Sequence, residues 1–298
     1  MMTANPKLKK NDNQPILDIR NLHVEAEQSS KNIPILTNIS FSLKKGEILS
    51  VIGESGSGLT VLSKSIMNWL PRPLFVSKGS VLFRSQNILN LSTQDLRKFR
   101  GKIFAYIGSD SSTALNPTVP IGKHLVSKLR AVMPEYSDTQ AQRRIIDLFD
   151  AVRIPSPKER FNEFPFQFSG GMMQRVMIVD ALCTDPELLV ADNITQPLDV
   201  TIAKQIVRLL YDLRDEFGTS VLFSTASLPM AADISEKLLV LQNGRVLEET
   251  TPEEIVNNPG TNYTKALSER VPRIWTSKHI PSQSISKEAI LSVKNVSK

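Results

Sequence analysis

The sequence contains few of the residues that cross-link a chain, bind metals or span membranes. Only one cysteine, Cys183, occurs in 298 residues, which excludes a disulfide scaffold and is typical of a reducing compartment. The three histidines, at positions 23, 124 and 279, are too scattered to suggest a metal site. No apolar run reaches the roughly 18 residues that a membrane-spanning helix needs, so the chain is not itself a membrane pore.

Charge is also modest. Thirty-six Lys and Arg residues against 30 Asp and Glu residues give a formal net charge of +6. Spread over 298 residues, this surplus is too diffuse to indicate a nucleic-acid partner, and we predict none. A composition with 41% hydrophobic residues excludes a disordered chain and allows one large domain or two small ones.

Apolar periodicity predicts strands that alternate with helices. We expect strands over residues 16–20, 35–43, 47–52, 102–109, 187–191, 220–224 and 237–241, and a hairpin turn at 242–244. Helices are expected over 59–69, 141–152, 170–182 and 200–217, with a mostly helical insert at about 111–165. This alternation predicts an α/β fold with a largely parallel sheet.

A glycine-rich loop joins the third predicted strand to a helix. It consists of Gly53, Glu54, Ser55, Gly56, Ser57 and Gly58. Glycines in this context let successive backbone N–H groups turn inward and bind phosphate at a helix N-terminus. Thr60 falls where a hydroxyl would hold magnesium, but Leu59 stands where the phosphate-loop pattern requires lysine.

Two further motifs give the loop a family context. Ser169-Gly170-Gly171-Met172 precedes a predicted helix, and Leu188–Asp192 is an apolar strand that ends in aspartate. With the glycine loop, these resemble the signature, Walker B and Walker A motifs of the nucleotide-binding subunit of ABC (ATP-binding cassette) transporters. Three local patterns resemble the dipeptide and oligopeptide importer branch: Leu115-Asn116-Pro117, Pro197-Leu198-Asp199-Val200-Thr201 and Asn262-Tyr263-Thr264-Lys265-Ala266-Leu267.

The resemblance implies a P-loop NTPase cassette. Such a fold has a mostly parallel core sheet, an antiparallel N-terminal β region and a helical subdomain. It also implies ATP and Mg²⁺ as cofactors, with Thr60 and Asp192 as the magnesium ligands.

Four positions depart from the family pattern. Leu59, Ser109, Asn193 and Ala226 replace the Walker A lysine, the glutamine that senses magnesium and the membrane partner, the glutamate that activates water, and the switch histidine. In phosphoryl transfer the protein mainly supplies charge stabilisation and positions the attacking water. We therefore predict a catalytically dead site that binds nucleotide weakly or not at all.

The signature half keeps its family pattern. In the family, two cassettes pair head to tail, and each ATP lies between one Walker A loop and the other cassette's signature. The resemblance therefore implies that Ser169, Gly170, Gly171, Met172 and Gln174 complete a partner's site, with Asp199 in the loop that crosses the dimer. It also implies transmembrane permease partners, an extracytoplasmic solute-binding protein indirectly, and a peripheral location on the cytoplasmic face of the membrane.

The expected domains are a polar tail (1–15), a cassette (16–258) and a C-terminal extension and linker (259–287). Residues 288–298 resemble the opening strand at 16–22 and suggest the truncated start of a second cassette, with chance similarity as the alternative. Three other readings stay open: a regulatory or interaction module without transport, a non-functional fragment of a tandem ABC ATPase, and an ATPase that is active despite Leu59.

Overall fold

A six-stranded sheet forms the centre of the molecule. The computed structural model describes residues 14–29, 31–110 and 113–271. The strand order is β10-β9-β3-β8-β7-β6. These strands are β3 (Ile48–Ile52), β6 (Phe104–Ile107), β7 (Leu188–Asp192), β8 (Ser220–Thr225), β9 (Lys237–Gln242) and β10 (Arg245–Thr250). All neighbours are parallel except the β9–β10 hairpin, and every residue of β3, β7 and β8 is buried. Runs buried on both faces are typical of parallel sheets covered by helices.

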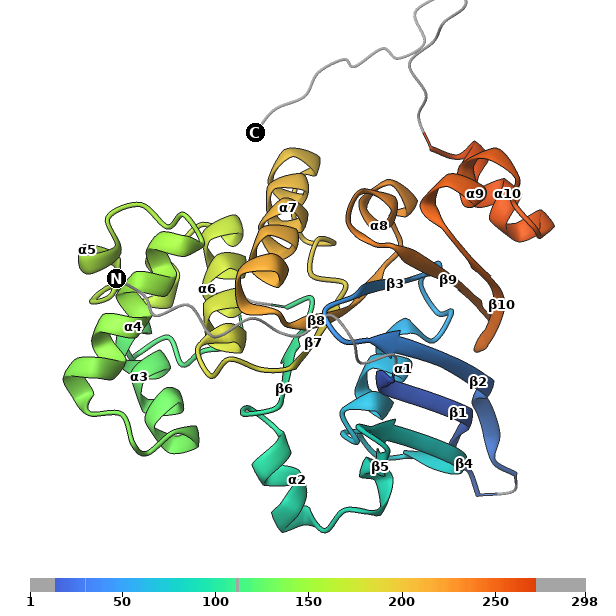
Figure 1. Cartoon of the computed structure of the whole chain (residues 1–298), viewed down its shortest axis with the longest axis horizontal. Coiled ribbons are helices and arrows are strands. Elements are labelled where there is room, and N and C mark those ends of the chain that lie inside the picture. The colour runs from blue at the N-terminus through green and yellow to red at the C-terminus, as the bar shows by residue number, and fades with distance from the viewer. Residues whose placement is uncertain (1–13, 30, 111–112, 272–298) are drawn as a thin grey trace, which may run out of the picture.

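A second, antiparallel sheet is built from the N-terminal part of the chain. Its order is β2-β1-β4-β5. The strands are β1 (Pro15–Ala26), β2 (Ile33–Lys44), β4 (Leu74–Phe83) and β5 (Gln86–Asn87). Figure 1 shows this sheet at one end of the molecule and helices α3, α4 and α5 at the opposite end. The parallel core, the antiparallel region and the helical subdomain confirm the expected fold class.

The helices complete the two ends and cover the core sheet. They are α1 (Leu59–Ile66), α2 (Thr93–Phe99), α3 (Ile121–Val132), α4 (Asp138–Ala151), α5 (Pro157–Arg160), α6 (Gly170–Leu182), α7 (Val200–Phe217), α8 (Leu228–Ile234), α9 (Pro252–Asn257) and α10 (Asn262–Glu269). Two 3₁₀ turns, η1 (Ile88–Asn90) and η2 (Pro165–Gln167), join them. The helices α3, α4 and α6 contact one another, so α6 ties the helical subdomain to the rest of the fold.

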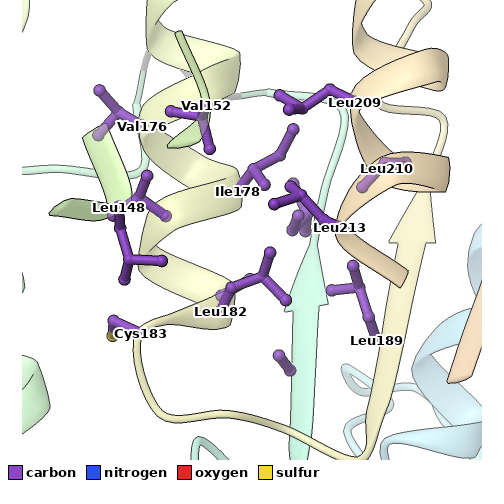
Figure 2. Packing of buried hydrophobic residues seen from close by; sticks show 14 of the residues in the cluster. Leu148, Val152, Val176, Ile178, Leu182, Cys183, Leu189, Leu209, Leu210 and Leu213 are labelled. Atoms are coloured by element: carbon purple, nitrogen blue, oxygen red, sulfur yellow. The ribbon is translucent and has the colours of Figure 1, made fainter. Parts of the chain in front are cut away.

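The core beneath α6 and α7 is apolar and closely packed. Figure 2 shows side chains from α4, α6, β7 and α7 meeting in one cluster, each no more than 4% exposed: Leu148, Val176, Ile178, Leu182, Leu189, Leu209, Leu210 and Leu213. Cys183 lies in the same cluster and is fully buried, as expected for a small apolar residue. This packing fixes α6, whose first turn carries the signature residues.

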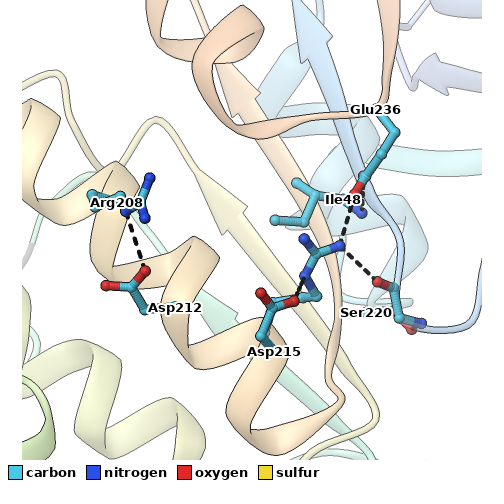
Figure 3. Close-up of polar contacts among 8 residues, drawn as sticks. Ile48, Arg208, Asp212, Asp215, Ser220 and Glu236 are labelled. Atoms are coloured by element: carbon cyan, nitrogen blue, oxygen red, sulfur yellow. Dashed lines mark hydrogen bonds and ion pairs between the residues drawn. The ribbon is translucent and has the colours of Figure 1, made fainter.

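Polar contacts around the end of α7 hold the entry to β3. Arg214 donates to the Gly46 carbonyl (3.0 Å) and pairs with Glu236 (2.7 Å). Glu236 in turn accepts from the Ile48 N–H (2.9 Å) (Figure 3). The Arg214 side chain is only 11% exposed. Since β3 leads directly into the glycine loop, this network helps to set the position of that loop.

Several boundaries differ from the expectations. The helix predicted over 59–69 ends at Ile66, because Asn68 takes a left-handed backbone conformation (φ 47°). The strand predicted over 102–109 is only Phe104–Ile107. In the insert, α3 begins at Ile121, and residues 111 and 112 lie outside the described chain. The tail at 1–13 and the segment 272–298, including the suggested second cassette strand, also lie outside it.

Strand β4 was not among the strands expected from the sequence, and it carries Gly79 at its centre. In the fold, Gly79 (φ 100°) lies against β1, where a β-carbon would stand 2.3 Å from the Asn21 carbonyl oxygen. The glycine is therefore required by a close approach of two strands.

Candidate functional site

The glycine loop has the geometry of a phosphate-binding turn. It continues β3, whose register extends to Gly53, where the N–H donates to the Thr225 carbonyl of β8 (3.3 Å). Helix α1 then begins at Leu59, with Gly58 at its N-cap in a left-handed conformation (φ 108°). A β-carbon at Gly58 would lie 2.7 Å from a Leu36 methyl group, so the turn needs glycine on both steric and conformational grounds. The loop thus presents backbone N–H groups at a helix start, as an anion site does.

A pocket of about 500 Å³ lies over this loop. Three of the four substituted positions, Leu59, Asn193 and Ala226, line it together with the loop itself. The remaining walls come from β2, α1, the segment after β7, α7, the end of β8, the segment after it and α8: Ile35, Thr60, Val61, Thr195, Gln196, Leu198, Val200, Ala203, Thr225, Ser227 and Met230. Ser109 does not line the pocket and is exposed after β6. The structure therefore brings together three of the four predicted departures.

The lining of the pocket carries one charged side chain. Of the described residues that line it, Glu54 alone is ionisable, and it is an acid. Its carboxylate forms an ion pair with Arg270 and lies 3.5 Å from the Tyr263 hydroxyl, which also accepts from the Glu54 N–H (3.3 Å). The backbone of the loop fits a phosphate group, whereas the lining offers no cation to neutralise one. Sequence patterns gave no signal for this contact, because Arg270 follows α10, more than 200 residues after the loop.

Leu59, at the position where the phosphate-loop pattern places lysine, is a buried apolar residue. The side chain is 6% exposed and belongs to the apolar cluster between α1, the antiparallel sheet and β9. Thr60, the next residue, is exposed. The first turn of α1 therefore directs an apolar group inward at the position where the phosphate-loop pattern places an ammonium.

Asp192 ends β7 and is 2% exposed. Its Oδ2 accepts from the Tyr106 hydroxyl (2.9 Å), and its Oδ1 lies 3.4 Å from the Asn193 amide nitrogen. Burial raises the pKa of Asp192, while hydrogen bonds from Tyr106 and Thr60 and the charge of Lys64 act in the opposite direction. Burial and the neighbouring carboxylate raise the pKa of Tyr106, so its hydroxyl stays protonated and remains a donor.

The predicted magnesium ligands lie close together, and one of them is already hydrogen-bonded by a side chain outside the predicted motifs. Thr60 and Asp192 are brought together, but the Tyr106 hydroxyl already occupies one carboxylate oxygen. Over residues 14–29, 31–110 and 113–271, the structure holds no cluster of three or more His, Cys, Asp or Glu residues suited to a metal. Tyr106 was not among the predicted site residues, because a tyrosine inside an apolar strand carries no motif.

The signature residues lie apart from the pocket, at the start of α6. Ser169 caps this helix and accepts from the Met172 N–H (3.3 Å). Ser169 and Gly170 are exposed, and Gly171 and Met172 are half-buried. A β-carbon added to Gly170 would meet no described atom within 4 Å, so the helix start is open.

Two other residues predicted to face a partner cassette, Gln174 and Asp199, differ in their exposure to solvent. Gln174 is fully buried, because the fifth residue of α6 turns toward the core, so the expectation that it faces a partner's site is not supported. Asp199 is exposed and caps α7, with its Oδ1 accepting from the Ile202 N–H (3.0 Å). Its neighbours Leu198 and Val200 line the pocket.

A glycine loop between a parallel strand and a helix, a six-stranded core sheet and a helical subdomain define an ATP-binding cassette. The chain belongs to the ABC transporter family, whose profile matches residues 36–196. It is 36% identical to the dipeptide transport ATP-binding protein DppD of Lactococcus lactis over 264 residues, which are 89% of this chain and 76% of that protein. It is also 36% identical to the oligopeptide transport ATP-binding protein OppD of Bacillus subtilis, over 88% of this chain and 73% of that protein.

Solved structures show the same fold. The dimeric cassette MJ0796, in a post-hydrolysis state bound to ADP and Pi, is 24% identical and superposes with a TM-score of 0.70, covering 79% of this chain and 98% of that one. The cbiO1 protein of Clostridium perfringens gives the same TM-score at 21% identity, covering 87% and 96%. Within the described part of the chain, every helix is too short or too polar to cross a membrane.

Proposed function

We propose that this chain is the nucleotide-binding subunit of a peptide-type ABC importer and that its own ATP site is catalytically inactive. One observation carries the proposal: the pocket over an intact glycine loop is lined by Leu59, Asn193 and Ala226 and by a single ionisable residue, Glu54. Hydrolysis needs cations on the transferred phosphate and a base for the attacking water. An amide at position 193 cannot accept that proton near neutral pH.

The signature motif at the start of α6 retains the residues of the family pattern. The start of α6 is exposed, capped by Ser169 and free of side chains at Gly170. A helix N-terminus favours anions through its free N–H groups and dipole. We infer that it completes the ATP site of a partner cassette, with Asp199 and its neighbours at the contact. ATP and Mg²⁺ would then be used in the partner's site, with weak or no binding at this chain's own site.

The relatives named for dipeptide and oligopeptide transport support the peptide-importer assignment. The proposed partners are a second cassette, transmembrane permeases and, indirectly, an extracytoplasmic solute-binding protein, at the cytoplasmic face of the membrane. We propose residues 16–258 as the cassette, with its helical subdomain at about 111–165. The C-terminal extension and linker (259–287) follow it.

A substitution at Gly170 tests the partner-facing half. Aspartate there has room for its side chain, and an acid in the first turn stabilises a helix by about 0.3–1 kcal/mol, so Gly170→Asp folds. Its carboxylate would, however, repel a partner's γ-phosphate. In the complex purified with its partner cassette and permeases, we expect Gly170→Asp to lower ATPase activity about 100-fold, the loss typical of one transition-state contact. The uncharged Gly170→Asn is the matched control and should retain more activity.

A second variant tests the chain's own half-site. Thr60→Val removes the hydroxyl that would serve a magnesium ion and keeps the side-chain shape. We expect it to leave the ATPase rate of the complex within about twofold, since this site supplies no transition-state stabilisation. Loss of activity with Thr60→Val, or full activity with Gly170→Asp, would overturn the proposal.

A further inference from the structure

Tyr106, on the edge strand β6 of the core sheet, reaches the acid at the C-terminal end of the neighbouring strand β7. Strand β6 pairs in parallel with β7, so that Tyr106 lies opposite Val190, two residues before Asp192. From there the hydroxyl reaches the Oδ2 of Asp192 at 2.9 Å. The carboxylate is therefore held by a neutral donor from the neighbouring strand.

The surroundings fix the tyrosine in this place. Its ring packs edge-on against Trp69, with the ring centroids 6.0 Å apart and the planes at 89°. Gly108 leaves room beside it, because a β-carbon there would lie 3.3 Å from Cε1 and 3.5 Å from the hydroxyl oxygen. A side chain at position 108 would thus crowd the ring. The hydrogen bond is one of several contacts that hold Tyr106 in one orientation.

The other groups around Asp192 are neutral donors as well. The Asn193 amide nitrogen lies 3.4 Å from Oδ1, and the Thr60 hydroxyl also hydrogen-bonds to the carboxyl group. A buried carboxylate requires partners for its lone pairs, and here hydroxyls and an amide supply them. Lys64 is the cation that acts on this group, through its charge.

We propose that the Tyr106 hydroxyl takes the place of a magnesium ion at Asp192, so that any phosphate group held by this glycine loop binds without a divalent metal. The inference rests on the proposed inactivity of the chain's own site and assigns a cause to it in addition to the missing lysine. Tyr106 acts through Asp192 and is a positioning residue.

Tyr106→Phe is the decisive variant, because it keeps the ring and its contact with Trp69 and removes only the hydroxyl. The full chain is dialysed to equilibrium against Mn²⁺, as a substitute for Mg²⁺, with ADP, and protein-bound metal and nucleotide are measured separately. We expect wild type to retain almost no metal and Tyr106→Phe to retain about tenfold more. Without the Tyr106 hydroxyl, the Oδ2 of Asp192 loses a hydrogen-bond donor and becomes available to bind a cation. Tyr211→Phe, which removes a hydroxyl on α7, is the matched control and should behave as wild type.

The proposal is overturned if Tyr106→Phe retains no more metal than wild type, whether both proteins retain metal or neither does. Tyr106→Met, which also lacks the hydroxyl, serves as the second variant if Tyr106→Phe loses its thermal unfolding transition. The measurement uses this chain without a partner. Its failure is therefore distinct from a failure of the ATPase test on the complex, which depends on Gly170.

Discussion

The substitution Leu59→Lys tests nucleotide binding separately from ATP hydrolysis. Leu59→Lys places an ammonium at the first turn of α1, beside the glycine loop. At about 4 Å from a phosphate and an effective dielectric constant near 20, one charge pair contributes about 4 kcal/mol before desolvation is subtracted. Allowing for that cost and for the acid Glu54 in the lining, we expect a net gain of about 1.4–2.8 kcal/mol, or ten- to a hundredfold tighter ADP binding.

The same substitution has a cost in stability. Leu59 is 6% exposed, and burying a leucine side chain contributes about 1.5–3 kcal/mol. The aliphatic stem of lysine can recover part of this, so we expect the free energy of unfolding to fall by about 2 kcal/mol. Urea denaturation measures that loss, and titration with a fluorescent ADP analogue measures the affinity.

Leu59→Met is the matched control, because it preserves the apolar volume at a cost below about 1.5 kcal/mol and adds no charge. If Leu59→Lys binds ADP no more tightly than Leu59→Met, the absence of a cation does not limit binding. Hydrolysis should stay at background in both variants, since Asn193 and Ala226 are unchanged. An active Leu59→Lys enzyme would refute the role assigned to those two positions.

Three further predictions concern stability and reactivity. Arg214→Met should lower the free energy of unfolding by about 2 kcal/mol through loss of its bonds to Glu236 and the Gly46 carbonyl, whereas Arg208→Met, which breaks an exposed pair, should change it by less than about 0.5 kcal/mol in the same urea titration. Burial raises the pKa of the Cys183 thiol to about 12, so a disulfide reagent at pH 8 should modify it only after unfolding. Burial also raises the pKa of Asp192 above its ordinary value of 3.8, so its ionisation removes stability as the pH rises from that value through the folded pKa. Asp192→Asn should therefore unfold at higher urea concentration than wild type at pH 8, with the difference vanishing below pH 4; a lower midpoint at pH 8 would contradict this.

Much of the fold could be predicted from local pattern. The helices at 170–182 and 200–217 match α6 and α7, because capping by Ser169 and Asp199 and an apolar stripe act within a few residues. The Asn243-Gly244 turn is confirmed, since both residues have the positive φ that a tight hairpin needs. Strand β4 was not predicted; it is set by its pairing with β1, where Gly79 packs against the Asn21 backbone, a contact between segments far apart in sequence.

The candidate site was also predictable from the sequence only in part. The order of the motifs, the intact glycines and the substitutions at 59, 109, 193 and 226 are properties of the sequence alone. Only the tertiary structure decided that Leu59, Asn193 and Ala226 face one pocket while Ser109 does not, and that Gln174 is buried. The Tyr106–Asp192 bond and the Arg270–Glu54 pair likewise join residues 86 and 216 positions apart. Such contacts depend on how strands and helices pack, and no local pattern carries that information.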